Sequence, residues 1–264
     1  MNVLDQIAAS KCREVEERKF RRPVHELEKM SFFKRPATSL REALQKKAGA
    51  GIVAEFKRRS PSKGLINAMA GVKEVVTAYE KGGACGISVL TDTPYFGGSL
   101  EDLMVARECS ACPLLRKDFI IDEYQIIEAR SHGADVVLLI ASLLSFSQIK
   151  QFSSVARSLG MEVLLELHEE KELEKIPDGI SMVGVNNRNL KTFHVSVEQS
   201  VLLAGKIPSG MIKIAESGIS SPAVISELFS HGYKGFLIGE CFMRESNPGE
   251  AFEKFINELH QKGL

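Results

Sequence analysis

Residues 113–141, PLLRKDFIIDEYQIIEARSHGADVVLLIA, contain the unit from which the chain is built. An apolar run, Pro113–Asp118, is followed by a stretch of helical character and then by a second apolar run, Asp135–Ala141. The helical stretch begins after Asp122, a residue type that favours helix starts, and ends at a His-Gly pair, a common helix stop. Two buried strands that flank one helix predict a parallel strand–helix–strand unit.

The same unit recurs along the chain from residue 51 onward. Apolar runs alternate with helical stretches such as Val72–Lys81 and Pro222–Ser230, and successive runs lie about 26 residues apart, enough for a crossover helix. The eight runs are Gly51–Lys57, Gly86–Thr91, Pro113–Asp118, Asp135–Ala141, Met161–His168, Ser181–Arg188, Met211–Ser217 and Gly235–Gly239. Eight such units without a long linker predict a single (β/α)8 barrel, or TIM barrel. The alternative is a doubly wound open sheet, but the first run leads into EFKRRSPSKG, which lacks the glycine fingerprint of that fold.

The residues before the first run form a helical extension. Leu4, Ile7 and Val15 recur at helical spacing, and the charged segment Glu16–Arg22 is interpreted as a solvated helix face. A looser stretch then leads to about Gly49. We therefore expect one barrel domain over residues 1–264, with residues 1–48 packed on it as an N-terminal extension.

Charge and cysteine content narrow the classes of function. The 264 residues include 34 Lys and Arg against 34 Asp and Glu, and this balance argues against a nucleic-acid partner. No apolar segment is long enough for a targeting signal or a membrane span. Five scattered cysteines are typical of free thiols in the cytoplasm, and the lone Cys109/Cys112 pair predicts small buried residues rather than a zinc or redox site. We expect a cytoplasmic monomer without an obligate protein partner.

Polar side chains end five of the eight runs, at the end of a barrel where active sites form. Because side chains alternate along a strand, Glu55 and Lys57 share the face of Val53. The same argument pairs Lys117 with Leu115 and Glu166 with Leu164. The polar strand ends are Glu55, Lys57, Lys117, Glu166, Asn186, Arg188, Glu216 and Ser217. A pairing network that only stabilises the barrel is the alternative, but so many charges at one rim favour a catalytic site.

The last two strands predict a phosphate site. A glycine turn at Ser217-Gly218 enters a helix, and the last run ends at Gly239-Glu240; backbone N–H groups after these strands bind phosphate in many barrels. Ser60 offers a hydroxyl from the loop after the first strand. The scattered histidines, among them His168, predict no metal site.

At this point the chain resembles the indole-3-glycerol-phosphate synthase family. The motifs that carry the resemblance are AEFKRRSPSKG (Ala54–Gly64), TDTPYFGGS (Thr91–Ser99), LLRKDFI (Leu114–Ile120), LLELH (Leu164–His168), GVNNRNL (Gly184–Leu190), AESGIS (Ala215–Ser220) and LIGECFM (Leu237–Met243). The resemblance covers essentially the whole chain. It implies that 1-(2-carboxyphenylamino)-1-deoxyribulose 5-phosphate is converted to indole-3-glycerol phosphate, carbon dioxide and water, with no cofactor and no metal.

The resemblance also implies roles for individual residues. Lys117 is the general acid, Glu166 its acid–base partner, and Lys57 orients the substrate carboxylate. Glu55 positions Lys57, and Asn186 binds a hydroxyl of an intermediate. The remaining expected contacts are Arg188, Glu216 and Ser217 for substrate, Phe96, Phe119 and Leu138 for the aromatic ring, and Ser60, Gly218, Gly239 and Glu240 for phosphate. Some family members have serine in place of Glu240, so we expect only its backbone N–H to face the ligand.

Two other interpretations remain open at this stage. One is another phosphosugar-binding barrel, such as a phosphoribosylanthranilate isomerase, whose chemistry favours a cysteine–aspartate pair where this chain has Glu55 and Lys57. The other is a non-catalytic metabolite-binding barrel, which has no need of Lys117 and Glu166. A lysine beside another cation in a partly dry site acts as an acid near neutral pH, which is the expectation for the acid here. The loop Lys57–Gly64 is a candidate lid.

Overall fold

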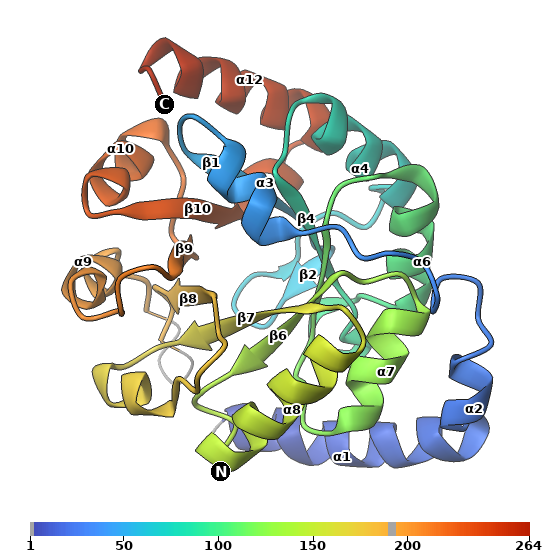
Figure 1. Ribbon diagram of the computed structural model, residues 1–264. Coiled ribbons are helices and arrows are strands. Elements are labelled where there is room, and N and C mark those ends of the chain that lie inside the picture. Colours follow the sequence, from blue (N-terminus) through green and yellow to red (C-terminus); the bar gives the residue numbers. More distant parts are fainter. Residues whose placement is uncertain (1–2, 190–193) are drawn as a thin grey trace.

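The structure is a computed structural model that describes residues 3–189 and 194–264. Its centre is a closed barrel of parallel strands in the order β1-β10-β9-β8-β7-β6-β5-β4 (Figure 1). The strands are β1 (Gly51–Phe56), β4 (Gly86–Leu90), β5 (Leu114–Lys117), β6 (Val136–Ile140), β7 (Glu162–Leu167), β8 (Met182–Asn186), β9 (Ile212–Glu216) and β10 (Tyr233–Ile238). Each strand overlaps one of the predicted apolar runs, and the predicted (β/α)8 barrel is confirmed. Leu190, the last residue of the GVNNRNL motif, lies outside the described residues.

Helices connect the strands and surround the barrel. They are α4 (Val72–Lys81), α6 (Leu100–Cys109), α7 (Glu123–Ser131), α8 (Phe146–Ser158), the 3₁₀ helix η1 (Glu170–Lys175), α9 (Glu198–Ala204), α10 (Pro222–Ser230) and α12 (Pro248–Gln261). Smaller elements in the loops are β2 (Arg59–Ser60), β3 (Gly64–Leu65), α5 (Thr93–Phe96) and α11 (Glu240–Met243). The helix ends follow the local sequence signals. Asp122 caps α7 as predicted, and the glycine after His132 adopts a φ of 92° that ends the helix.

Two apolar layers explain why the strands read as continuous hydrophobic runs. One layer fills the space between strands and outer helices, and the other fills the barrel. Val53, Leu115 and Leu164 all belong to the inner layer. The predicted inward faces are therefore correct, and the polar residues that follow on those faces point toward the barrel opening.

The stretch before β1 is more ordered than the sequence predicted. It contains α2 (Val24–Leu27) and α3 (Leu40–Lys46), so the expectation of a loose segment is wrong. The carboxylate of Glu162, at the start of β7, accepts hydrogen bonds from the first backbone N–H groups of α3, at 2.9 Å from Leu40 N and 3.1 Å from Arg41 N. An anion at this position stabilises a helix N-terminus.

Helix α3 closes the floor of the barrel. Leu40 and Leu44 are fully buried and pack on glycines at or near the starts of three strands. A Cβ at Gly51 would lie 2.5 Å from a methyl group of Leu44, and one at Gly86 would lie 2.6 Å from a methyl group of Leu40. The helix therefore depends on glycines of β1, β4 and β10, two of them far along the chain, so its own seven residues indicate it only weakly.

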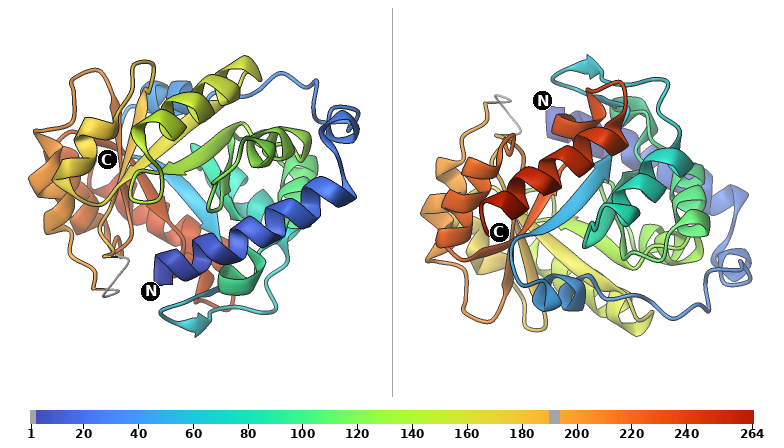
Figure 2. Two further views of the ribbon diagram at one scale, coloured as in Figure 1. Left: turned by 90° about the horizontal axis from the view of Figure 1, so that it is seen from below. Right: turned by 90° about the horizontal axis from the view of Figure 1, so that it is seen from above.

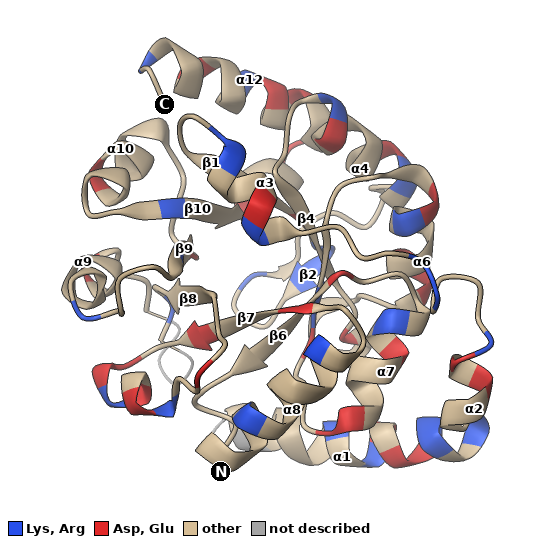
Figure 3. Cartoon of the chain, in the orientation of Figure 1, with Lys and Arg blue, Asp and Glu red and all other residues tan. Residues whose placement is uncertain are grey.

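The first helix, α1 (Val3–Arg21), lies along the lower edge of the molecule in Figure 1 and crosses in front of the barrel in the left panel of Figure 2. The expected solvated face in residues 16–22 is only partly present. Arg18 and Lys19 form ion pairs with Glu128 and Asp122 at α7, at 3.1 and 2.7 Å. Residues of both signs lie close together on α1 and α12 (Figure 3).

The described residues also bear on membrane spans, metal ligands and thiols. No helix in the described part of the chain is long and apolar enough to cross a membrane. Across residues 3–189 and 194–264, no group of three or more His, Cys, Asp or Glu side chains has the arrangement of a metal site. All five cysteines are free thiols, and Cys109 and Cys112 are half-buried rather than buried as predicted, because they lie at the surface end of α6 and the turn that follows.

Candidate active site

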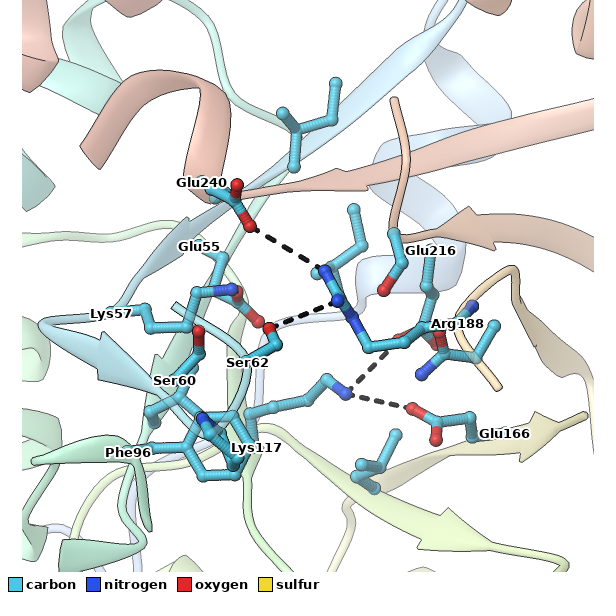
Figure 4. A pocket seen from close by; sticks show the side chains of 18 of the residues that line it. Glu55, Lys57, Ser60, Ser62, Phe96, Lys117, Glu166, Arg188, Glu216 and Glu240 are labelled. Atoms are coloured by element: carbon cyan, nitrogen blue, oxygen red, sulfur yellow. Dashed lines mark hydrogen bonds and ion pairs between the residues drawn. The ribbon is translucent and has the colours of Figure 1, made fainter. Parts of the chain in front are cut away.

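A pocket opens at the C-terminal ends of the strands, inside the ring of loops that follow them (Figure 4). Every residue predicted from sequence to serve catalysis, substrate or phosphate lines this pocket: Glu55, Lys57, Ser60, Phe96, Lys117, Phe119, Leu138, Glu166, Asn186, Arg188, Glu216, Ser217, Gly218, Gly239 and Glu240. The barrel thus brings together residues from most of its length.

Lys117 lies at the centre of the pocket. It ends β5, and its Nζ is 2.9 Å from Oε2 of Glu166 on β7 and 3.2 Å from Oε2 of Glu216 on β9. Burial disfavours the charged form, but the two carboxylates outweigh burial and hold the pKa of Lys117 above the ordinary lysine value. The expectation of a lysine activated by a second cation is therefore wrong, because the nearest charged neighbours of Lys117 are carboxylates.

Glu166 and Glu216 form a buried carboxylate pair around this ammonium group. Both are almost fully buried, with side-chain exposures of 2% and 1%. Burial opposes ionisation of Glu166, yet Lys117 and, to a smaller extent, His168 hold its pKa below the ordinary glutamate value. Nε2 of His168 lies 3.2 Å from Oε1 of Glu166. Burial and the charge of Glu166 raise the pKa of Glu216. The two glutamates beside Lys117 are therefore shifted in opposite directions, the pKa of Glu166 downward and that of Glu216 upward.

A second lysine–glutamate pair comes from β1 and the residue that follows it. Nζ of Lys57 donates to Oε1 of Glu55 at 2.6 Å, and Glu55 is buried beneath it. The close approach of β10 requires a glycine at this point: a Cβ at Gly239 would lie 2.6 Å from Oε1 of Glu55. Gly239 therefore leaves room for the carboxylate that holds Lys57.

Arg188 spans the opening of the pocket (Figure 4). Its Nη1 donates to the hydroxyl of Ser62 at 3.1 Å, and its Nη2 lies 3.7 Å from Oε2 of Glu240. Lys63 approaches the same carboxylate at 3.9 Å. The Glu240 side chain thus lies at the rim with two cations, and the expectation that only its backbone N–H faces a ligand stays a prediction.

The turn after β9 has an unusual backbone. Ser217 has a φ of 63°, a conformation that side-chain-bearing residues rarely adopt, and Gly218 follows with a φ of 74°. The side-chain amide of Asn187 donates to the carbonyl of Ser217 at 3.1 Å and holds the turn. Such strained turns cluster at ligand-binding sites.

One side of the pocket is apolar. The rings of Phe96 and Phe119 lie 6.0 Å apart between centroids, and Leu138 and Ile140 continue the surface. Leu4 and Ile7 of α1 also line it. The wall suits a planar aromatic group beside the charged centre.

Ser62 and two residues of α1 also line the pocket, and their place there was not predicted from sequence. Leu4 and Ile7 were recognised only as part of an apolar helical stripe, and nothing local indicates that this stripe covers the pocket. A signal was present in Lys11, which lies on the same helix face as Ile7. A charged residue within an apolar stripe indicates a buried partner, because an unpaired buried charge is costly.

The closed barrel and a pocket lined from its C-terminal strand ends place the chain in the class of (β/α)8-barrel enzymes. A family model described as indole-3-glycerol phosphate synthase matches residues 4–255. The chain belongs to the indole-3-glycerol phosphate synthase family, whose members are carboxy-lyases of tryptophan biosynthesis.

Curated relatives carry the same name. The indole-3-glycerol phosphate synthase of Bacteroides thetaiotaomicron is 44% identical over 258 residues, which cover 98% of this chain and 99% of that protein. The synthase of Carboxydothermus hydrogenoformans is 42% identical over 261 residues, covering 96% and 99%.

Solved structures share the fold at low identity. A chain of the tryptophan synthase a2b2 complex from Pyrococcus furiosus has a TM-score of 0.59 at 16% identity and covers 81% of this chain and 98% of that chain. Thiamine phosphate pyrophosphorylase from the same organism has a TM-score of 0.58 at 16% identity and covers 84% and 98%. These likenesses support the barrel and nothing more specific.

Proposed function

We propose that this protein converts 1-(2-carboxyphenylamino)-1-deoxyribulose 5-phosphate to indole-3-glycerol phosphate, carbon dioxide and water, without a cofactor. The observation that carries the proposal is the position of Lys117. Its ammonium group lies between Glu166 and Glu216 in a pocket that also has an apolar wall and a cationic rim. The proposed acid, the proposed base and the apolar wall that would bind the aromatic ring therefore lie in one cavity.

Ring closure needs a proton donor at the sugar ketone. The ring carbon that bears the carboxylate attacks the ketone carbon, and negative charge develops on the ketone oxygen. Lys117 is the general acid in this step. Its raised pKa keeps it protonated at neutral pH, and the developing alkoxide is basic enough to take its proton. Lys57, held by Glu55, orients the substrate carboxylate, whose loss then partly restores aromaticity.

Dehydration completes the pyrrole ring and needs a base and an acid. Glu166 has a lowered pKa and is ionised, so it is the base that removes the remaining proton. The departing hydroxyl takes a proton from an ammonium group, and Asn186 binds this hydroxyl before it leaves. Both lysines line the pocket, and between them they serve the two proton donations.

The pocket has a separate surface for each end of the substrate. Phe96, Phe119 and Leu138 accept the anthranilate ring. The phosphate binds at the opposite side, to Ser60 and to the backbone N–H groups of Gly218, Gly239 and Glu240, while Arg188 supplies positive charge. Glu216 and Ser217 contact the sugar between these ends.

The direct test is turnover of the anilino-ribulose phosphate followed by indole fluorescence. Lys117→Ala is expected to remain folded and to lose at least ~100-fold in turnover, a typical loss for an acid or base. Lys254→Ala is the matched control, because Lys254 is exposed on α12 outside the pocket. Absence of product from the unaltered protein, or near-normal turnover by Lys117→Ala, contradicts the proposal.

We also propose that the protein acts as a monomer in the cytoplasm. The strand ends of a single barrel supply the proposed acid, base and ring wall, and the five free thiols suit a reducing compartment. Sedimentation at micromolar concentration is the test of the monomer.

A further inference from the structure

Lys11 is a buried cation on a helix that covers the active site. Its side chain is 1% exposed, and its Nζ lies 2.9 Å from Oδ2 of Asp92 and 3.0 Å from Oδ1 of Asp118. A third carboxylate, that of Glu14, is 2.8 Å away on the same helix. Removing one partner from such a buried group leaves an uncompensated charge, so the contacts fix the position of α1 strongly.

The two aspartates belong to the segments that carry the aromatic wall. Asp92 caps α5, where its Oδ1 accepts from Tyr95 N at 2.8 Å, and α5 ends at Phe96. Asp118 follows Lys117 directly, and its Oδ1 accepts from Phe119 N at 2.8 Å. Lys11 therefore joins the backbone that positions Phe96 to the backbone that positions Phe119.

Asp118 is itself held by residues of the barrel. Its Oδ2 accepts from the hydroxyl of Thr91 at 2.6 Å and from Nη2 of Arg116 at 2.9 Å. Arg116 is fully buried and also pairs with Glu128 of α7 at 2.9 Å. The barrel side of the contact is thus fixed by several partners, and Lys11 attaches to it the end of α1 that lies nearest the pocket.

The same face of α1 reaches the pocket. Leu4, Ile7 and Lys11 follow one another at spacings of three and four residues, so their side chains lie along one side of the helix. Leu4 and Ile7 line the pocket and belong to the same apolar cluster as Phe96 and Phe119. A shift of α1 along or away from the barrel would therefore change the space available to a planar ring.

We propose that Lys11 is a positioning residue for the ring-binding side of the active site, which holds Leu4 and Ile7 of α1 in register with Phe96 and Phe119. The inference rests on the proposed function, because the ring is that of the anthranilate substrate or the indole product. Lys11 touches no reacting atom, and its effect is on recognition of the ring rather than on phosphate binding.

The test compares two ligands that differ in the ring. Indole-3-glycerol phosphate contains the ring and the phosphate, whereas glycerol 3-phosphate contains only the phosphate end. In Lys11→Met, which keeps the aliphatic stem and removes the charge, we expect the Kd of indole-3-glycerol phosphate to rise at least ~10-fold and that of glycerol 3-phosphate to change less than ~2-fold. A merely structural role would weaken both ligands alike, and that result overturns the inference.

Two further variants keep the test decisive. Lys11→Met/Asp92→Asn removes a buried carboxylate along with its partner, and it provides a folded protein if the single variant is unstable. Like Lys11→Met, this double variant is expected to bind indole-3-glycerol phosphate more weakly and glycerol 3-phosphate normally. An unaltered Kd for indole-3-glycerol phosphate overturns the inference. Lys19→Met is the matched control, because Lys19 joins α1 to Asp122 away from the pocket, and it is expected to bind both ligands normally.

The outcomes separate this inference from the proposed function. If the unaltered protein makes no indole-3-glycerol phosphate, the proposed function fails. If it does so and Lys11→Met binds both ligands as the unaltered protein does, only the role of Lys11 fails.

Discussion

Nζ of Lys117 lies 2.9 Å from Oε2 of Glu166, although the two residues are 49 positions apart and belong to β5 and β7. The contact crosses the interior of the barrel at its C-terminal end. A cation and a carboxylate from different strands meet there because the inward faces of both strands end in a charged residue. The proposed chemistry depends on this meeting.

Glu166→Gln tests the carboxylate half of this pair. Glutamine keeps the shape of the side chain but does not accept a proton, so turnover is expected to fall at least ~100-fold while the barrel remains folded. Steady-state kinetics with the anilino-ribulose phosphate measure the effect, and Glu253→Gln on the exposed face of α12 is the control. Turnover within a factor of about two of the unaltered protein would remove Glu166 from the mechanism.

Glu216→Gln is expected to change the pH dependence of stability. Burial raises the pKa of Glu216 to about 8 from its ordinary 4.5. The charge of Lys117 lowers this pKa, but the charge of Glu166 raises it. Between these values the folded protein keeps a proton that the unfolded chain has lost. The free energy of unfolding therefore falls as pH rises through this window, with each pKa unit worth about 1.4 kcal/mol.

Glutamine imitates the protonated form and loses nothing as pH rises. Urea denaturation at pH 5, 7 and 9 should therefore show the stability of Glu216→Gln, relative to the unaltered protein, increasing with pH. Glu253→Gln should show no such trend. A difference that is constant across the three pH values would mean that Glu216 carries no perturbed proton.

Glu240→Gln is expected to strengthen binding of anions at the pocket rim. The Glu240 carboxylate lies 3.7 Å from Arg188 and 3.9 Å from Lys63, where it competes with a phosphate for the same cations. Because the group is partly exposed, the effect is modest: we expect inorganic phosphate to inhibit about 2- to 5-fold more strongly, and less so at high salt.

Inhibition constants at two salt concentrations measure this effect. Glu245→Gln is the control, because Glu245 is an exposed carboxylate paired with Arg244 nearby. Weaker inhibition in Glu240→Gln would indicate that the carboxylate organises the phosphate site rather than competing with it.

Leu44→Ala tests the floor of the barrel. Leu44 is fully buried against Gly51 and Gly235, and its truncation leaves a cavity that α3 cannot fill. A loss of about 2–5 kcal/mol in the free energy of unfolding is expected from urea titration. Leu202→Ala, at a leucine that is 64% exposed, should cost far less. Equal losses at the two positions would contradict the role assigned to α3.

The strands and the candidate site were predictable from sequence for the same reason. A strand that is buried on both faces appears in the sequence as a run of apolar residues. A polar residue at the end of such a run is therefore easy to recognise. Glu55, Lys117 and Glu166 each follow such a run, and the alternation of side chains gives their direction. The barrel then determines that these ends converge.

Contacts between distant segments were not predictable. Helix α3 has only seven residues, and its stability comes from Glu162 and from glycines in other strands. Lys11 finds its partners at positions 92 and 118, and nothing near it in sequence identifies them. Lys117 is a further example. An activated lysine with a lowered pKa was expected, but β7 and β9 each place a glutamate beside it, and its pKa is raised.

The most direct measurement of the central claim is a crystal structure with indole-3-glycerol phosphate bound. The account predicts the indole ring against Phe96 and Phe119, the phosphate at the N–H groups of Gly218 and Gly239, and the Lys117 amine within hydrogen-bonding distance of the ligand. Product bound outside this pocket, or a Lys117 amine that faces away from it, would contradict the account.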